Sequence, residues 1–218
     1  MIKYLSMVKT IIFDFDGTMG DSFKVALEIA HQLTGKSELI DEKEVAKLRT
    51  LSLFKAASEL RIPKRIWPIL LIKGRKMMAD RLIEVKLFPG VEQLIEKLYK
   101  SNFQLYIVSS NSKSSITKIL DHYNILSYFK NIYGGIGLLG KAKTLRFIMK
   151  QKNINKDMLL YIGDETRDIT AAKKNHIKSI AVSWGYMSRD LLLAQEPWAI
   201  VDSVKELYEI IAKWDQAT

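Results

Sequence analysis

Short runs of apolar and β-branched residues alternate with segments of helical periodicity along most of this chain, and this alternation is what most constrains the fold. It is typical of parallel strands joined by crossover helices. Most of the runs are apolar throughout, as strands covered on both faces should be. The sequence therefore predicts an α/β fold with a Rossmann-like, doubly wound parallel sheet. The predicted strands are Lys9–Phe15, Gln104–Val108, Asn131–Tyr133, Met158–Ile162, Ser179–Val182 and Ala199–Val201.

One long segment interrupts this alternation. From about Gly20 to Lys86 the chain shows helical periodicity, without a convincing strand between Asp21 and Val85. The main pattern then resumes with a helix predicted over Val91–Lys100, where apolar residues keep helical spacing. We therefore expect an all-helical cap subdomain at 20–86, inserted into an α/β core formed by 1–19 and 87–218.

The composition narrows the class of protein. The chain has 218 residues, 48% of them apolar, which is enough for a large buried core. It has no cysteine, which excludes disulfides, zinc–thiolate centres and thiol nucleophiles. No run approaches the roughly 18 apolar residues of a membrane-spanning helix, and the first residues lack the cleavage site of a signal peptide. We therefore expect a cytoplasmic location and no membrane partner.

The formal charge of +10 raises the question of a nucleic-acid partner. The basic residues are scattered, with no Lys/Arg block and no alternation of aromatic and basic residues of the kind that binds single strands. We interpret them as a lysine-rich solvated surface and do not expect nucleic acid to bind. The same positive field would attract a small anionic substrate.

Two carboxylates directly follow the first predicted strand, in the pattern Asp14-Phe15-Asp16-Gly17-Thr18. Residues two apart on a strand point to the same side, and the chain begins to turn at the strand's carboxyl end. Asp14 and Asp16 can therefore converge in the crevice where open α/β sheets bind ligands. Carboxylates this close repel unless a cation separates them or one holds a proton. Helix capping, the structural alternative, does not need such a pair.

A second acidic group follows the predicted strand Met158–Ile162. Gly163 and Asp164 come first, and Asp168 lies four residues further on. Three or four hard oxygen donors at one edge of a sheet suit Mg²⁺, which usually shares its coordination shell with a substrate phosphate. For Asp168 alone, the alternative of a helix cap stays open, because it begins a predicted helix.

Polar residues also follow the strand Gln104–Val108. Ser109, Ser110 and Asn111 lead into a helix predicted to start near Lys113, where unpaired amides and hydroxyls could bind an oxyanion. These residue types are equally common as ordinary helix caps. Lys141, at the start of another predicted helix, could offset the charge of a phosphate and of the aspartates.

The glycine-rich turn before Lys141 matches two nucleotide-binding patterns superficially. Residues 135–140 read G-x-G-x-x-G, and 135–141 match most of a P-loop. However, Ala142 stands where a P-loop needs Ser or Thr for Mg²⁺. Asp164 comes too late to be the acidic residue of the dinucleotide pattern. We do not expect a nucleotide to bind at this turn.

Taken in order, Asp14-x-Asp16-Gly17-Thr18, Ser109, Lys141 and Gly163-Asp164-x-x-x-Asp168 resemble the four motifs of the haloacid dehalogenase-like hydrolases. The resemblance spans nearly the whole chain. Residues 87–91, Leu-Phe-Pro-Gly-Val, are similar to the return from cap to core in the phosphoglycolate-phosphatase-like branch. The sequence departs from the pattern of this branch at two places, and neither holds a proposed catalytic atom. Met19-Gly20 stands where the branch usually has two larger apolar residues, and Ala142 stands where a proline is common.

The resemblance implies a role for each motif. Asp14 would attack the phosphoryl group and form an aspartyl-phosphate, and Asp16 would act as general acid and then base. The implied Mg²⁺ ligands are Asp14, the backbone carbonyl of Asp16 and Asp164, with Asp168 assisting. The residues expected to contact the phosphate are Gly17, Thr18, Ser109, Ser110, Asn111 and Lys141.

These observations favour an Mg²⁺-dependent phosphatase acting on a small acidic phosphomonoester, whose specificity would depend on cap arginines. Two alternatives stay open at this point. A phosphomutase would return the same phosphoryl group to a sugar phosphate, and a binding or regulatory protein would keep the fold without turnover. The cap arginines are Arg49, Arg61, Arg65, Arg75 and Arg81.

Overall fold

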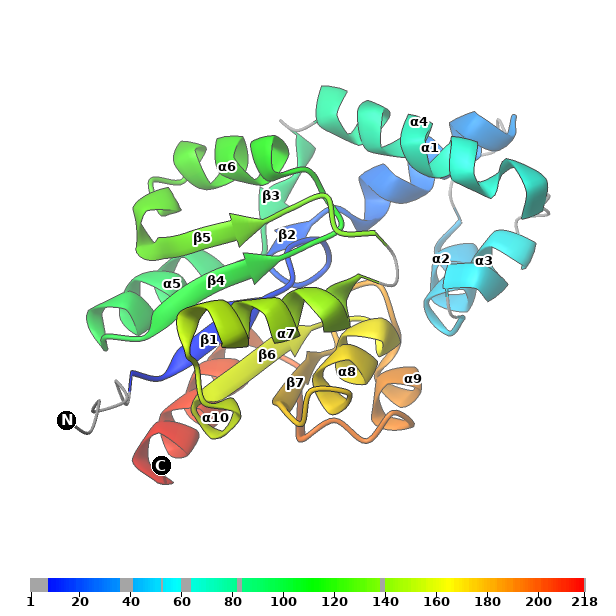
Figure 1. Cartoon of the computed structure of the whole chain (residues 1–218). Coiled ribbons are helices and arrows are strands. Elements are labelled where there is room, and N and C mark those ends of the chain that lie inside the picture. Colours follow the sequence, from blue (N-terminus) through cyan, green and yellow to red (C-terminus); the bar gives the residue numbers. More distant parts are fainter. Residues whose placement is uncertain are drawn as a thin grey trace.

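The central element is a six-stranded sheet. The computed structural model describes residues 8–35, 41–51, 53–59, 64–81, 84–137 and 140–217. The strands of the sheet are β1 (Thr10–Phe13), β4 (Gln104–Val108), β5 (Phe129–Tyr133), β6 (Leu159–Gly163), β7 (Lys178–Val182) and β8 (Ala199–Val201). They lie in the order β5-β4-β1-β6-β7-β8, and every neighbouring pair is parallel (Figure 1). The predicted α/β class and all six predicted strands are confirmed.

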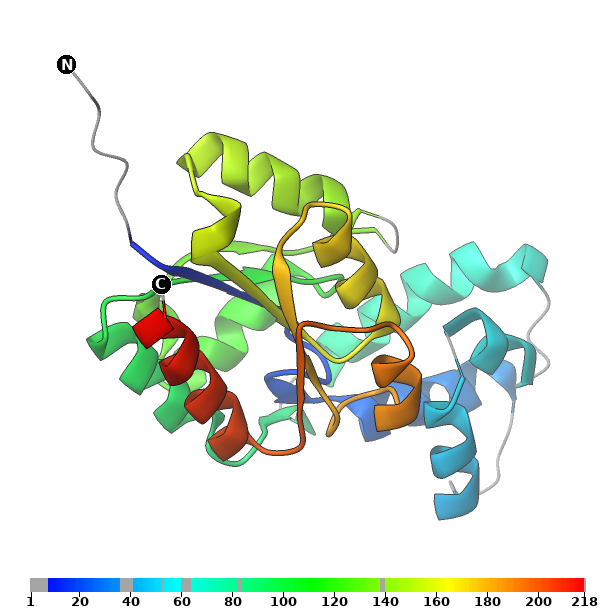
Figure 2. The same cartoon turned by 90° about the horizontal axis from the view of Figure 1, so that it is seen from below.

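Helices cover both faces of this sheet, as the doubly wound prediction requires (Figures 1 and 2). The predicted helix Val91–Lys100 is present with the same ends. The helices of the core are α5 (Val91–Lys100), α6 (Lys113–His122), α7 (Lys141–Lys152), α8 (Thr166–Lys173), α9 (Arg189–Leu193) and α10 (Val204–Ala217), with 3-10 turns η3 (Leu126–Tyr128) and η4 (Lys156–Met158).

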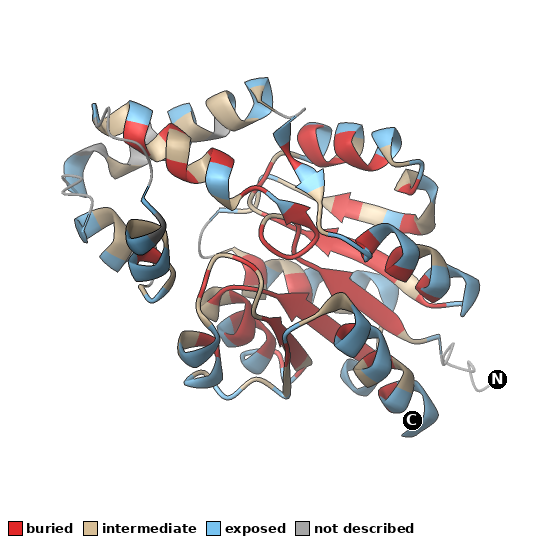
Figure 3. Ribbon diagram, turned by 180° about the vertical axis from the view of Figure 1, so that it is seen from behind, coloured by how far each residue is buried: buried red, intermediate tan, exposed pale blue. Residues whose placement is uncertain are grey.

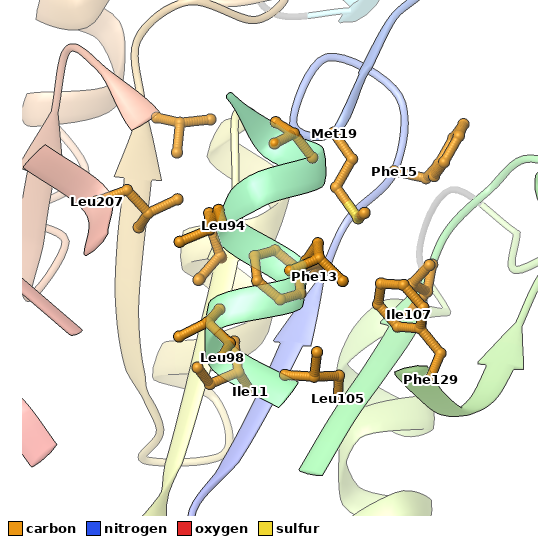
Figure 4. Close-up of a cluster of buried hydrophobic side chains, with 14 of the residues drawn as sticks. Ile11, Phe13, Phe15, Met19, Leu94, Leu98, Leu105, Ile107, Phe129 and Leu207 are labelled. Atoms are coloured by element: carbon orange, nitrogen blue, oxygen red, sulfur yellow. The ribbon is translucent and has the colours of Figure 1, made fainter. Parts of the chain in front are cut away.

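Successive side chains of β1 point to opposite faces of the sheet, and helices cover both faces. The strand therefore shows no alternation of apolar and polar residues. Ile11 and Phe13 pack in a cluster with residues of α5, α6 and α10 (Figure 4). Ile12 packs on the other side with residues of α7 and α8. Each side chain is 0 to 1% exposed, and burying one such side chain stabilises the fold by about 1.5–3 kcal/mol. The central strands β1 and β6 are buried throughout, and β4 is buried after its first residue (Figure 3).

A helical insertion lies beyond the carboxyl ends of the central strands (Figure 1). Its helices are α1 (Phe23–Thr34), α2 (Glu42–Arg49), α3 (Leu53–Glu59) and α4 (Trp67–Asp80), with the 3-10 turn η1 (Lys64–Ile66). Two strands of two residues each, β2 (Gly20–Asp21) and β3 (Lys86–Leu87), pair antiparallel where the chain enters and leaves it. These two strands lie at the boundaries of the segment predicted to be helical, and they escaped prediction because two residues are too few to show strand periodicity.

One cap arginine contacts the core directly. The Arg49 guanidinium donates from Nη2 to the Ser183 carbonyl at 2.8 Å. The Ser188 amide in turn donates to the Arg49 carbonyl at 2.7 Å. Arg81 instead pairs within the insertion with Glu28 and Glu84.

Of the other three cap arginines, the structure describes the side chain of one. Arg65 is exposed. Arg61 and the side chain of Arg75 lie outside the described residues. None of the helices in the described part of the chain combines the length and apolar character that a membrane crossing requires.

Candidate active site

The site begins where β1 ends. The Asp14 amide donates to the Ile162 carbonyl of β6 at 2.8 Å, which continues the ladder by one residue. The chain then turns sharply, because the Phe15 carbonyl accepts the amides of both Met19 and Gly20 at 2.9 Å. This turn ends the strand two residues earlier than the sequence predicts. It leaves the Asp14 side chain at the carboxyl edge of the sheet.

Three carboxylates converge at this edge, from β1 and from the segment after β6. One oxygen from each of Asp14, Asp164 and Asp168 lies within 4.8 Å of the others, and all three residues are buried. β1 and β6 are neighbours in register, with Phe13 opposite Ile162, so the residues that follow them emerge side by side. The predicted convergence of two strand ends is present.

Lys141 lies between two of these carboxylates. Its Nζ is 2.6 Å from Asp14 Oδ2 and also contacts Asp168 Oδ1. Burial alone would favour the neutral amine, but the two carboxylates raise the pKa of Lys141 above its ordinary value, so the lysine is a cation. Burial also raises the pKa of Asp14 to about 7, against the lowering effect of the Lys141 charge.

Both carboxylate oxygens of Asp168 accept hydrogen bonds. Oδ1 accepts from the Tyr161 hydroxyl at 2.9 Å as well as from Lys141. Oδ2 accepts from the Glu165 amide at 3.1 Å, which forms a capping box at the start of α8. The capping alternative therefore applies to Asp168, and the same carboxylate also anchors Lys141.

Asp164 is oriented by the turn after β1 and by the loop after β7. The Thr18 hydroxyl donates to Oδ1 at 2.8 Å, and the Tyr186 amide donates to Oδ2 at 2.7 Å. Burial, together with the nearby Glu165 carboxylate, raises the pKa of Asp164 well above its ordinary value. Because the Thr18 hydroxyl is engaged with Asp164, its expected contact with phosphate stays a prediction.

Two glycines allow the backbone to approach Asp164 this closely. A Cβ on Gly17 would lie 2.1 Å from Asp164 Oδ2, and Gly17 also has φ +76°. A Cβ on Gly185 would lie 2.3 Å from the same oxygen and 2.3 Å from the Gly17 carbonyl. No real side chain tolerates such distances, so both turns require glycine.

Asp16 lies in a different environment from Asp14. It is half-buried, and its Oδ1 accepts from Asn111 Nδ2 at 3.2 Å. Burial raises the pKa of Asp16, while hydrogen bonds from Ser22 and Asn111 oppose the rise. Its side chain is not part of the three-carboxylate group found among the described residues. A carboxyl with a raised pKa beside a nucleophile is suited to donate a proton.

The loop Ser109–Asn111 lies beside Asp16 but does not cap α6. The cap is Ser112, whose hydroxyl accepts the Ser115 amide at 3.0 Å. Ser109 is fully buried, and its hydroxyl accepts the Asn111 amide at 3.1 Å. The helix-cap alternative is therefore wrong for these residues, and the Asn111 side chain faces Asp16 instead.

The glycine-rich turn supports this loop. The Gly135 amide donates to the Asn111 carbonyl at 2.6 Å, and the Ile136 amide donates to the Ser109 carbonyl at 3.1 Å. Residues 138 and 139 of the turn lie outside the described part of the chain. These contacts give the turn a packing role next to the candidate site.

Several residues at the site are missing from the sequence prediction. They are Ser22, Tyr161, Glu165, Arg167, Gly185 and Tyr186. Gly185 and Tyr186 follow β7, so the rule that strand ends carry the site could have identified that loop. Tyr161 lies within a buried strand, and nothing in its local pattern indicates that its hydroxyl reaches Asp168.

The acidic group suits a hard divalent cation. Buried carboxylates this close repel one another, which is one reason why their pKa values rise. Oxygen donors in such a group match the ligands that Mg²⁺ prefers. Asp14 and Asp164 come from adjacent strand ends, and Asp164 Oδ1 and Oδ2 each have one hydrogen-bond donor from the chain. The second lone pair on each oxygen is available to a metal.

Comparison with known proteins identifies one matching family and several similar proteins. The family model described as haloacid dehalogenase-like hydrolase matches residues 11–182. The phosphoglycolate phosphatase of Synechococcus elongatus is 31% identical over 208 residues, which cover 94% of this chain and 98% of that protein. The phosphoglycolate phosphatase of Vibrio parahaemolyticus is 27% identical over 94% of this chain and 96% of its own length. A 5′-nucleotidase of Pseudomonas aeruginosa is 27% identical, with coverage of 86% and 88%.

Solved structures agree with this fold. A crystal structure of a predicted phosphatase from Clostridium acetobutylicum superposes with a TM-score of 0.79 at 26% identity, covering 94% of this chain and 99% of its own. A haloacid dehalogenase-like hydrolase from Streptococcus pneumoniae superposes with a TM-score of 0.76 at 23% identity, with coverage of 94% and 99%. The similarity therefore extends over the insertion as well as the sheet.

Proposed function

Since this chain belongs to the haloacid dehalogenase-like hydrolases and is a phosphatase of their phosphoglycolate-phosphatase-like branch, we propose that it hydrolyses a small acidic phosphomonoester with Mg²⁺ and with Asp14 as the nucleophile. One observation supports this most. The Asp14 carboxylate lies at the end of the central strand, among two further carboxylates and the Lys141 cation. Such a site can attract a phosphoryl group and attack it.

In the proposed first step, an Asp14 oxygen bonds to phosphorus as the ester P–O bond breaks. Asp16 donates its proton to the leaving oxygen, so that an alcohol departs rather than an alkoxide. In the second step, Asp16 takes a proton from water, and the water oxygen attacks the aspartyl-phosphate. Asp14 is thereby regenerated and inorganic phosphate is released. The raised pKa of Asp16 supports this exchange of one proton.

Mg²⁺ held by Asp14, the Asp16 carbonyl and Asp164 would neutralise charge on the phosphoryl oxygens. We assign Asp168 mainly to holding Lys141, because its Oδ1 already accepts from two donors of the chain and its Oδ2 from a third, whereas Asp164 has one donor on each oxygen. Lys141 and the loop Ser109–Asn111 would then contact the phosphoryl group, with Gly17 in the adjacent turn.

The substrate would be enclosed between the sheet edge and a cap formed by residues 20–86, with 1–19 and 87–218 as the core. Support comes from the position of α1 to α4 beyond the strand ends and from the antiparallel β2–β3 pair at the junction. The relatives named phosphoglycolate phosphatase favour a two- or three-carbon acid phosphate. The relative named 5′-nucleotidase makes a nucleotide the main competitor.

Phosphate release from a panel of esters, with Mg²⁺ and with EDTA, tests the proposal. Asp14→Asn should lose at least about a thousandfold in turnover, because the amide cannot form the covalent intermediate. Asp121→Asn is the control, since Asp121 is exposed on α6. Full turnover by Asp14→Asn would exclude Asp14 as the nucleophile. A rearranged ester without free phosphate would identify a phosphomutase instead.

A further inference from the structure

Arg167 is a partly buried cation at the site that the four motifs do not include. It is the second residue of α8, between Asp164 and Asp168. Its Nη2 contacts Glu165 Oε1 and donates to the Ser110 hydroxyl at 3.3 Å. The Glu165 side chain is 6% exposed and that of Arg167 is 23% exposed, so the carboxylate side of this ion pair is shielded from water.

The strand order places Arg167 across the phosphoryl site. Ser110 follows β4 and Arg167 follows β6, and β1 lies between these two strands. A side chain that connects the two loops must therefore cross the carboxyl end of β1, where Asp14 lies. Arg167 accordingly lies near enough to Asp14 for its positive charge to act on that carboxylate.

The Arg167 guanidinium has two hydrogen-bond donors for which the described residues provide no acceptor. Arg167 Nε and Nη1 are buried and have no hydrogen-bond partner among the described residues. Unpaired buried donors on a cation carry a desolvation cost that a ligand's acceptor atoms would remove. A phosphoryl group between Asp14 and Lys141 would offer acceptor oxygens for them.

The balance of charges at the site also supports a role for Arg167 in binding phosphate. Five carboxyl groups surround the site, and Lys141 and Arg167 are the cations that face them in the described structure. A phosphate brings further negative charge into this group, so a second cation beside it would lower the barrier to its entry. The carboxyl groups are Asp14, Asp16, Asp164, Glu165 and Asp168.

We propose that Arg167 is a catalytic residue that donates through Nε and Nη1 to phosphoryl oxygens, with Glu165 and Ser110 holding the guanidinium in place. This role deepens the proposed phosphatase function and rests on it. Glu165 is then a positioning residue. Arg167 complements Lys141, since the two cations reach the phosphoryl group from different helix starts, α8 and α7.

Two readouts test the role: kcat/KM for ester hydrolysis, and the Kd of inorganic phosphate measured by calorimetry in the presence of Mg²⁺. Arg167→Met should lower kcat/KM about 100-fold and weaken phosphate binding at least about tenfold. Arg167→Lys keeps the charge but loses the planar fork, so it should fall between. Arg146→Met, at an exposed position of α7, is the control and should match the wild type.

A double variant separates this role from simple neutralisation of Glu165. If Arg167 only balances that charge, Glu165→Gln with Arg167→Met should restore turnover and phosphate binding, and this recovery would overturn the inference. We expect the double variant to stay as impaired as Arg167→Met. If Arg167→Met does not fold, Arg167→Lys and the double variant decide. Unchanged phosphate Kd in an otherwise active Arg167→Met also overturns it.

The same experiment keeps the two proposals apart. A wild-type protein that hydrolyses no ester would contradict the phosphatase proposal, whatever Arg167 does. A wild-type protein that hydrolyses esters, together with an Arg167→Met variant of equal kcat/KM, would contradict only the role of Arg167.

Discussion

Asp14 and Asp16 are two residues apart, yet their surroundings suit them to different roles. Asp14 contacts Lys141, a cation that favours its ionised form. Burial raises the pKa of both carboxyls; for Asp14 the Lys141 charge is the largest effect opposing this rise, whereas for Asp16 the largest opposing effects are hydrogen bonds from the neutral Ser22 and Asn111 side chains. An ionised carboxylate can attack phosphorus, and a protonated one can donate to a leaving group. These environments support the proposed division of the roles of nucleophile and acid between two identical side chains.

The division of roles predicts that the loss of activity caused by Asp16→Asn depends on the leaving group. Alkyl phosphates leave as strongly basic alkoxides and need a proton, so their turnover should fall about 100-fold to 10,000-fold. Aryl esters such as p-nitrophenyl phosphate leave as stabilised phenolates, so formation of the aspartyl-phosphate should slow far less. Burst kinetics with both ester types would measure this first step. Equal loss of the burst rate for both would contradict the acid role of Asp16.

At the scale of elements, the site is assembled from loops that follow parallel strands. Asp14 follows β1, Asp164 follows β6, and the loop after β7 provides the Tyr186 amide that orients Asp164. Each loop is short, so its backbone lies against its neighbours. Small changes in one loop therefore reach side chains that another loop carries.

Gly185→Ala tests this coupling between loops. The new Cβ would overlap Asp164 Oδ2 and the Gly17 carbonyl, so Asp164 must move. We expect the Kd of Mg²⁺ to rise at least about tenfold, because supporting contacts of a metal ligand typically contribute this much. Gly137→Ala is the matched control, since nothing lies within 4 Å of its added Cβ. Calorimetric Mg²⁺ titration of both variants measures the effect, and equal affinities would contradict the coupling.

At the scale of the whole molecule, the acidic site lowers stability when no cation is bound. Folding raises the pKa of Asp14 from 3.8 to about 7. The native state therefore binds more protons than the unfolded state between these values, so the free energy of unfolding falls as pH rises from about 4 to about 7. Below pH 4 both states are protonated at Asp14, and this cost disappears.

Asp14→Asn removes that titration, so in EDTA it should become more stable than the wild type as pH rises from about 4 to 7. The difference should be small at pH 4 and reach up to about 4 kcal/mol above pH 7. Urea unfolding at a series of pH values measures it. Mg²⁺ should stabilise the wild type and shrink the difference. A difference that does not change with pH would contradict the raised pKa of Asp14.

Much of this molecule follows from local sequence. The alternation of strand and helix patterns predicts the sheet, because a strand covered on both faces must be apolar throughout. The motif residues fall at strand ends for the same reason: parallel strands share one carboxyl edge, so Asp14 and Asp164 meet there. β2 and β3 escaped prediction because each has only two residues.

Tertiary structure decided which donor meets which acceptor. The sequence places Asp168, Thr18 and Ser110 near the site, but only the folded chain directs them to Lys141, Asp164 and Arg167. Those contacts join segments up to 146 residues apart, and they depend on strand register and on turns that glycine permits. Local periodicity carries information on which way a side chain points. It carries no information on which residues of other segments contact that side chain.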